Sequence, residues 1–268
     1  MLLPRIDNLL RYSIVSNFWQ NFLSRIGVEV ESTTETVRRS LKTARIVAFT
    51  GAGISAESQV PTFRGKDGLW RNYRPEALAT AAAFESDPHL VWEWYDWLRS
   101  LIHAAQPNPG HLALTELQQR AAAGFTLVTQ NMDGLHEKAG SQDVVKLHGD
   151  IWLLRCTKCG REGRNEQVPI EPMPPLCPCG GILRPGIVWF GEMLPVDEWE
   201  RATDAAQSAE IFMAIGTSAV VYPAAGLVQM AKHARARVLI VNPEPSPADE
   251  YADWILRGPA GEILPRLL

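Results

Sequence analysis

The chain has 268 residues, of which 46% are hydrophobic and 21% charged, and its formal net charge is −4 at pH 7. This length suffices for one large domain with its own apolar core and, beside it, a small module. Because the charge balance is mildly acidic and no basic stripe is present, the composition argues against a nucleic-acid-binding protein, and no apolar run is long enough to span a membrane.

Residues 1–43 are predicted to form an N-terminal helical extension, in which Glu31–Leu41 is the helix that leads into the main domain. Met1–Gly27 lacks the continuous apolar stretch of a secretory signal. A surface helix or a start codon assigned too early explains this segment better than an amphipathic transit sequence. All four cysteines lie between Cys156 and Cys179 and nothing indicates export, so we expect a reducing, cytoplasmic location.

The apolar segment Ala44–Thr50 is predicted to be a buried strand that opens the main domain, residues 44–268. Gly51 and Gly53 follow, where the chain must turn sharply from the strand into a helix. Glycine lets the backbone approach a pyrophosphate, and a helix N-terminus offers N–H donors, so this turn predicts a dinucleotide site. The loop Pro61–Trp70, rich in glycine, arginine and aromatic residues, comes directly downstream and is suited to clamp a cofactor.

Helices and strands alternate along the rest of the chain. A helix is expected from Asp87, whose side chain can cap it, to Ala105, and Gln106–Gly110 ends it. The alternation predicts an α/β fold with a parallel sheet. The further expected elements are a helix at 111–122, strands at 125–129 and 144–149, extended structure at 187–191, a strand at 211–216, a helix at 224–234 and a last core strand at 237–241.

The cysteines lie in a proline-rich stretch, residues 152–184, that has little periodicity. Four thiolates suit tetrahedral zinc, and the stretch lacks a core of its own, so we predict a structural zinc site in a small insert. A redox dithiol and a rubredoxin-like iron site are the alternative interpretations. The second pair is more closely spaced than the first, so its loop must differ. The predicted ligands are Cys156, Cys159, Cys177 and Cys179.

Polar residues follow the ends of several predicted strands, at the edge where open α/β sheets bind ligands. Gln130–Asp133 can bind a ribose or an amide, with an Asx turn as the alternative. His148 ends a strand and can take a hydroxyl proton near neutral pH, although a single histidine is more often structural. Gly216–Ser218 and Asn242–Glu244 are candidates for phosphate and ribose contacts, or ordinary turns.

Together these segments resemble the sirtuins, a family of NAD-dependent protein-lysine deacylases, over about residues 44–268. Each motif is weak alone, but all of them occur in the order that the family shows. The motifs are Gly51–Ser55, Pro61–Arg64, Gln130–Asp133, Leu147–Gly149, the four cysteines, Val188–Glu192, Gly216–Ser218 and Asn242–Glu244.

The resemblance implies a large Rossmann-type domain and a small domain that combines a zinc ribbon with a helical insert. NAD and an acylated lysine of a protein or peptide would enter the cleft between them from opposite sides, and neither a nucleic acid nor a membrane is an expected partner. The large part would comprise residues 44–62, 110–150 and 185–268, the helical insert 63–109, and the zinc module 151–184.

By this resemblance His148 is the general base, and Asn131 and Asp133 order the nicotinamide ribose and carboxamide pocket. Phe63 would shield the reactive face and Arg64 would lie near the phosphates. The segment with Val188, Trp189, Phe190, Gly191 and Glu192 would pair with the substrate peptide as a strand. The implied cofactor-binding positions are Gly51, Ala52, Gly53, Ser55, Ala56, Glu57, Thr62, Phe63, Arg64, Trp70, Gln130, Asn131, Met132, Asp133, Gly216, Thr217, Ser218, Asn242, Pro243, Glu244 and Ala260.

The implied reaction consumes NAD. The acyl oxygen of the modified lysine attacks the ribose carbon that carries nicotinamide, and His148 then removes a proton from a ribose hydroxyl. That hydroxyl attacks the bound imidate, and water then releases the lysine, so the products are nicotinamide, free lysine and O-acyl-ADP-ribose. The main alternative is an NAD-dependent protein ADP-ribosyltransferase. A hydride-transfer oxidoreductase and a non-catalytic acyl-lysine reader fit the motifs less well.

Tyr95 and Arg99 bear on whether the acyl group is acetyl or an acidic group such as succinyl or malonyl. In the sirtuin subclass that removes acidic acyl groups, which Ala56 also matches, a tyrosine and an arginine three residues apart bind the distal carboxylate. Here Leu98 occupies position i+3 and the arginine lies at i+4, on the same helical face. Either Arg99 still pairs with a carboxylate, or the two residues merely cover the helix surface while Leu98 packs in the core.

Overall fold

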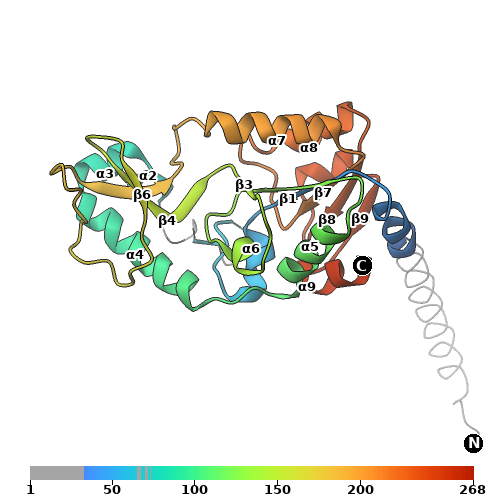
Figure 1. Ribbon diagram of the computed structural model, residues 1–268, viewed down its shortest axis with the longest axis horizontal. Coiled ribbons are helices and arrows are strands. Elements are labelled where there is room, and N and C mark those ends of the chain that lie inside the picture. Colours follow the sequence, from blue (N-terminus) through green and yellow to red (C-terminus); the bar gives the residue numbers. More distant parts are fainter. Residues whose placement is uncertain (1–32, 65–67, 70–71, 73) are drawn as a thin grey trace, which may run out of the picture.

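The structure is a computed structural model that describes residues 33–64, 68, 69, 72 and 74–268 (Figure 1). The helix predicted at Glu31–Leu41 is observed over residues 33–41, and the residues before it lie outside the described ranges. No helix within these ranges is long and apolar enough to cross a bilayer. The described residues form two sheets, a larger one to the right in Figure 1 and a smaller one to the left.

The larger sheet has six strands, is parallel throughout and has the strand order β3-β2-β1-β7-β8-β9. This is the doubly wound order of a Rossmann-type fold, with its topological switch point between β1 and β7. The predicted parallel α/β fold is therefore confirmed. The strands are β1 (Ile46–Thr50), β2 (Phe125–Thr129), β3 (Val145–Lys146), β7 (Ile211–Ile215), β8 (Arg237–Val241) and β9 (Trp254–Leu256).

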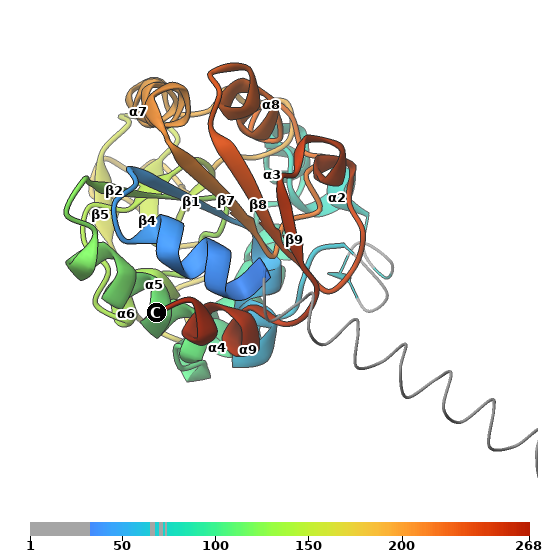
Figure 2. The same ribbon diagram turned by 90° about the vertical axis from the view of Figure 1, so that its right-hand side faces the viewer.

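Helices cover both faces of this sheet (Figure 2). The helices α7 (Val196–Ser208) and α8 (Gly226–His233) lie on one face, whereas α5 (Pro109–Arg120), α9 (Ala260–Ile263) and residues 33–41 lie on the other. Because both faces are covered, whole strands are apolar, and every residue of β1 and β7 is buried. Successive side chains of each strand enter the two core layers alternately.

The smaller part combines an antiparallel sheet, of strand order β5-β4-β6, with three helices. Its core is rich in aromatic residues, among them Trp92, Tyr95 and Trp189, which are almost fully buried. Asp87 caps the predicted helix α4, because its carboxylate accepts the Leu90 N–H at 3.0 Å. The elements are α2 (Pro75–Leu78), α3 (Ala81–Ser86), α4 (Pro88–Ala104), β4 (Gly149–Cys156), β5 (Glu162–Arg164) and β6 (Leu183–Ile187).

Two predicted extended segments end earlier in the structure, and the strand predicted to be the last is followed by another. The strand expected at 144–149 is reduced to β3, because Gly149, with φ of +79°, turns the chain into β4 of the other sheet. The extended stretch expected at 187–191 stops at Ile187, because a turn follows in which the Glu192 N–H donates to the Trp189 carbonyl at 3.0 Å. The strand at 237–241 is not the last, since β9 pairs with it.

The helix α7 is absent from the sequence prediction. Its fully buried residues are two alanines, Ala202 and Ala206, so it lacks the stripe of large apolar side chains that marks α4. The proposed boundaries between the large part, the helical insert and the zinc module stay a prediction. The remaining elements are η1 (Ala52–Ser58), α6 (Leu135–Lys138), η3 (Pro247–Tyr251) and η4 (Leu264–Leu267).

Candidate active site

Two glycine turns meet at the switch point of the large sheet. Gly51 follows β1 and Gly216 follows β7, and the Gly53 N–H donates to the Gly216 carbonyl at 2.8 Å. A Cβ on Gly53 would lie 2.7 Å from the Gly216 oxygen, so glycine is required for the two turns to touch. The contact leaves backbone, rather than side chains, at the position where open α/β sheets bind dinucleotides.

Buried polar side chains from two loops bond to one another behind these turns. The Asn131 amide donates to the Gly51 carbonyl at 3.1 Å and to Ser55 Oγ at 3.3 Å. Ser55 in turn donates to Asp133 Oδ2 at 2.8 Å, and Asp133 Oδ1 accepts the Leu135 N–H at 2.9 Å. Burial raises the pKa of Asp133, and these hydrogen bonds oppose that shift only in part.

His148 lies between β3 and β4 and is half-buried. Its Nδ1–H donates to the Gln130 carbonyl at 3.0 Å, which leaves Nε2 as the basic nitrogen of the neutral ring. Burial lowers the pKa of His148; the Gln130 carbonyl raises it, and the positive charge of Arg64 lowers it further. The imidazole is therefore neutral at pH 7 and able to accept a proton there.

A cavity of about 170 Å³ opens beside His148. It brings together residues that the sequence analysis assigned to cofactor contact, to proton transfer and to substrate binding. One wall is Val188–Glu192, and another is Val221–Pro223, which the sequence analysis did not single out. The one indication in the sequence that Val221–Pro223 belongs to the site is that it comes just after the Gly216–Ser218 turn. The lining residues are Phe63, Arg64, Ala79, Tyr95, Gln130, Met132, His148, Ile187–Glu192, Leu194 and Val221–Pro223.

Tyr95 and Arg99 reach different places, although both belong to α4. Tyr95 lines the cavity, where its hydroxyl accepts the Trp189 Nε1–H at 3.0 Å. Arg99 does not line it. Its Nη1 donates to the Ile151 carbonyl at 2.8 Å, and its Nη2 donates to carbonyls in the loop 165–167 at 2.9 and 3.0 Å. The structure therefore does not bring the two side chains to one ligand position.

The alternative interpretation of this pair also needs correction. Tyr95 and Arg99 do not cover the helix surface, because their exposed fractions are 1% and 0%. Leu98 does pack in the core, as that interpretation expects. Burial lowers the pKa of Arg99, although neighbouring carboxylates raise it. The guanidinium also lies 4.8 Å from the centre of the Trp152 ring, so Arg99 is an interior side chain of the smaller part.

The other predicted cofactor-binding residues are mostly engaged in local contacts. Thr217 Oγ1 accepts the Gln130 Nε2–H at 2.9 Å, which links two of the turns. The Glu57 carboxylate accepts the Gly261 N–H at 2.7 Å, next to buried Ala260. The Asn242 amide donates to the Glu244 carbonyl at 2.9 Å. Ala52, Ala56, Ser218 and Pro243 follow the ends of β1, β7 and β8 and are half-buried or exposed. Thr62 is half-buried and donates to the Arg64 carbonyl at 2.9 Å, and Trp70 lies outside the described residues.

Two buried histidines support the polar residues and were not identified from the sequence. His136 Nε2 bonds to Thr50 Oγ1 at 2.9 Å, Thr50 donates to Thr129 Oγ1 at 2.8 Å, and Thr129 accepts the Asn131 N–H at 3.0 Å. The ring of His111 lies 4.9 Å from that of His136. Burial lowers the pKa of both, that of His111 to about 4. In the sequence, each of these two residues is only a histidine within a short helical pattern, which does not indicate a buried polar role.

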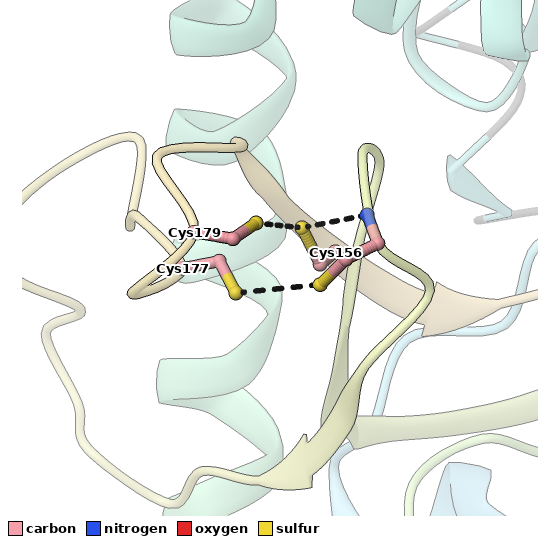
Figure 3. A group of neighbouring side chains, drawn as sticks. Cys156, Cys177 and Cys179 are labelled. Atoms are coloured by element: carbon pink, nitrogen blue, oxygen red, sulfur yellow. Dashed lines mark hydrogen bonds between the residues drawn. The ribbon is translucent and has the colours of Figure 1, made fainter.

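The cysteines form one group, in which the ligand atoms all lie within 4.8 Å of one another. Figure 3 shows Cys156 facing the loop that carries Cys177 and Cys179. The Sγ atoms of Cys156 and Cys179 are 3.5 Å apart, and those of Cys159 and Cys177 are 3.8 Å apart. Thiolates bound about 2.3 Å from one tetrahedral zinc lie about 3.8 Å apart, so the predicted zinc ligands fit the ion. The backbone N–H of Cys159 lowers the pKa of Cys156 to about 6, which favours the thiolate.

This chain is similar in sequence to known proteins of one family. A sequence model of the Sir2 family matches residues 51–223. The NAD-dependent protein deacylase of Aquifex aeolicus is 54% identical over 214 residues, 80% of this chain and 89% of that protein. NAD-dependent protein deacylase 2 of Pyrobaculum aerophilum is 53% identical over 223 residues, 83% of this chain and 89% of that protein.

Solved structures show the same likeness. A crystal structure of a Sir2 homolog–NAD complex has a TM-score of 0.81 and 46% sequence identity, and the match covers 87% of this chain and 91% of that chain. A complex of Sir2 with a p53 peptide and NAD+ has a TM-score of 0.76 and 31% identity, over 85% of this chain and 93% of that chain. Both likenesses therefore cover more than four fifths of this chain.

Proposed function

The chain belongs to the Sir2 family, and we propose that it is an NAD-dependent protein deacylase whose reaction takes place in the cavity beside His148. Two relatives about half identical in sequence bear that activity in their names, and a similar structure holds NAD. One observation supports this location of the reaction: the same cavity is lined by the neutral imidazole of His148, by the loop residues Phe63 and Arg64, and by the segment Val188–Glu192. NAD is the co-substrate, and the products are nicotinamide, free lysine and O-acyl-ADP-ribose.

His148 is the general base in this proposal. NAD supplies a ribose carbon from which nicotinamide can leave, and the acyl oxygen of the substrate takes its place. The Nδ1–H is hydrogen-bonded to the Gln130 carbonyl, so Nε2 is the nitrogen that takes a proton from a ribose hydroxyl. That hydroxyl then attacks the acyl carbon, and water releases the free lysine. Burial keeps the ring neutral, so this step is available at pH 7 without prior deprotonation.

The glycine turns and the buried polar network hold NAD in this proposal. The contact between Gly53 and Gly216 supports it, because backbone at the switch point can approach a pyrophosphate closely. Asn131 and Asp133 are fixed by Ser55 before any ligand arrives, so little ordering of these side chains remains to be done on binding. Zinc holds the cysteine ribbon and takes no part in the reaction, since all four ligand positions are filled by thiolates.

The acyl group that we propose is uncharged, as in acetyl-lysine. The arginine of the predicted carboxylate-binding pair, Arg99, is buried and donates to backbone carbonyls away from the cavity. Arg64, the cation among the described lining residues, belongs to the loop that the family resemblance assigns to phosphates. Among the described residues, a succinyl or malonyl carboxylate therefore has no dedicated partner, whereas Tyr95 and Trp189 offer an aromatic wall to a neutral group.

The variant His148→Ala tests the proposed base. Steady-state formation of deacetylated peptide from NAD and an acetyl-lysine peptide should fall by about 10²- to 10⁴-fold, because general-base catalysis is lost. NAD affinity, measured by calorimetry, should stay near that of the wild type. His233→Ala is the matched control, since His233 is exposed at the end of α8 and should leave turnover unchanged. Full activity of His148→Ala, or labelled NAD left covalently on protein, would contradict the proposal.

A further inference from the structure

The cavity wall Val188–Glu192 lies beyond the end of β6 and is not part of a strand. A segment that presents its backbone to a peptide must be held in one conformation, because ordering it on binding would weaken affinity. Strand pairing reaches only the first residue of this wall, whose N–H donates to the His148 carbonyl at 3.0 Å, and it does not order the turn that follows. The side chain of Arg184, which belongs to β6, does.

Arg184 is buried and contacts two residues of the wall segment, Glu192 and Trp189, and also Ile187, which directly precedes the segment. Its Nη1 donates to Glu192 Oε1 at 2.5 Å and its Nη2 donates to Glu192 Oε2 at 2.9 Å, which makes a two-pronged ion pair. Nη2 also donates to the Ile187 carbonyl at 3.0 Å. The guanidinium carbon lies 3.5 Å from the centre of the Trp189 ring, in a cation–π contact.

Both carboxylate oxygens of Glu192 are engaged within the chain. Besides Arg184, Oε2 accepts the Trp189 N–H at 2.8 Å. Burial raises the pKa of Glu192, but the hydrogen bonds from Arg184 and Trp189 outweigh it, so the pKa lies below its usual value. The carboxylate is therefore ionised at pH 7 and closes the turn between Trp189 and Glu192.

Trp189 carries this restraint into the rest of the cavity. Its Nε1–H donates to the Tyr95 hydroxyl at 3.0 Å, and its ring centre lies 5.2 Å from that of Phe84. The next residue, Phe190, donates its N–H to the Ala79 carbonyl at 2.9 Å. Fixing Trp189 therefore fixes the backbone on both sides of it and the aromatic wall beside it.

We propose that Arg184 is a positioning residue for the acylated peptide, because through Glu192 it holds the Val188–Phe190 backbone in the conformation that pairs with a peptide strand. This inference rests on the proposed function, since it requires that the peptide lie along this segment. It gives Glu192 a role inside the protein, in place of the direct substrate contact that the family resemblance implies. Arg184 does not line the cavity, so its loss acts on peptide binding rather than on the chemical step.

Two conservative variants test the inference, Arg184→Lys and Glu192→Gln. Each keeps the approximate length of the side chain and removes the two-pronged ion pair. We expect the KM for an acetyl-lysine peptide to rise about tenfold or more in both. The kcat at saturating peptide and the KM for NAD should change by less than about threefold, because NAD binding and proton transfer use other residues. Steady-state nicotinamide release, with each substrate varied separately, measures all three constants.

Arg201→Lys is the matched control, because Arg201 forms an ion pair with Asp143 at 2.7 Å and does not line the cavity. It should leave the three constants at their wild-type values. An unchanged peptide KM in the two test variants overturns the inference, and so does an equal loss of kcat and NAD affinity. If Arg184→Lys does not fold, as judged by circular dichroism, Glu192→Gln decides alone.

A failure of the proposed function would look different. Wild-type protein would then release no nicotinamide, whatever the peptide. Calorimetric titration with the acetyl-lysine peptide would still test the positioning role, because it measures binding without turnover. Weaker binding in Glu192→Gln than in Arg201→Lys supports the inference in that case, and equal binding overturns it.

Discussion

The parallel sheet and the cysteine ribbon, β4 to β6, achieve order by different means. In the sheet, every residue of β1 and β7 is buried between two layers of helices, so apolar burial stabilises it directly. In the ribbon, β5 is exposed throughout and most residues between Cys159 and Cys177 are exposed or half-buried. The sheet therefore depends on excluding water, whereas the ribbon packs only part of β4 and β6 against the aromatic core and otherwise depends on a metal ion and on polar tethers such as Arg99.

This difference divides the candidate site. The sheet supplies the glycine turns, Asn131 and His148, which the proposal assigns to NAD and to proton transfer. The smaller part supplies Tyr95 and, beyond β6, the wall Val188–Glu192, which the proposal assigns to the acylated peptide. Damage to the ribbon should thus impair peptide binding first, and damage to the sheet should impair everything at once.

Removal of zinc should have the largest effect, and it tests whether the ribbon depends on the metal while the large sheet does not. Purified protein should contain one zinc per chain, and the ion should be lost in Cys156→Ser or after treatment with a chelator. Deacylation should then be abolished, because β6 and the wall that follows it lose their support. Far-UV circular dichroism should retain the signal of the large sheet and its helices. Metal analysis that finds a zinc-free chain with full activity would refute the assignment.

The variant Arg99→Leu tests the polar tether of the same region. It leaves carbonyls of Ile151 and of the loop 165–167 without their donor, so the free energy of unfolding should fall by about 4 kcal/mol. Urea unfolding measures this, and Arg120→Leu, at an exposed ion pair, should change it by less than about 0.5 kcal/mol. Activity on matched acetyl- and succinyl-peptides should decrease in equal proportion. A selective loss of desuccinylation would instead restore Arg99 as a carboxylate reader.

Acid should weaken the sheet side through His111. Its pKa is about 4 in the folded protein, against about 6.5 for an unfolded chain, so the unfolded state binds more protons between these values. The free energy of unfolding should therefore be intact above about pH 6.5 and fall by up to about 3 kcal/mol as the pH decreases towards 4. Urea titrations at several pH values, with zinc in excess, measure this slope.

The variant His111→Asn is the control for this slope. Its side-chain oxygen can still accept the Asn108 N–H that His111 Nδ1 accepts at 3.3 Å, but it does not titrate. The pH dependence of unfolding should become shallower. An identical slope in the variant would mean that other groups, such as His136, carry the effect.

The parts of the fold that could be predicted from the sequence are those with a local physical cause. Gly51 and Gly53 could be identified because a close backbone approach requires glycine, and the zinc ligands could be identified because a thiolate cluster requires cysteine. Arg99 could not be placed, because its partners Ile151 and Asn165 are distant in sequence. The helix α7 could not be predicted, because its buried residues are alanines and it therefore lacks a stripe of large apolar side chains.

The cavity walls differ in what they are attached to. Apart from the bond of Val188 to the His148 carbonyl, Val188–Glu192 is bonded to Ala79, Tyr95 and Arg184 of the smaller part, whereas Val221–Pro223 follows β7 of the large sheet. A peptide bound along both walls would span two bodies that rest on separate cores. A bound peptide would then hold the two parts together. By linkage, the folded state should open less often, and the protein should resist proteolysis best, while the peptide is bound.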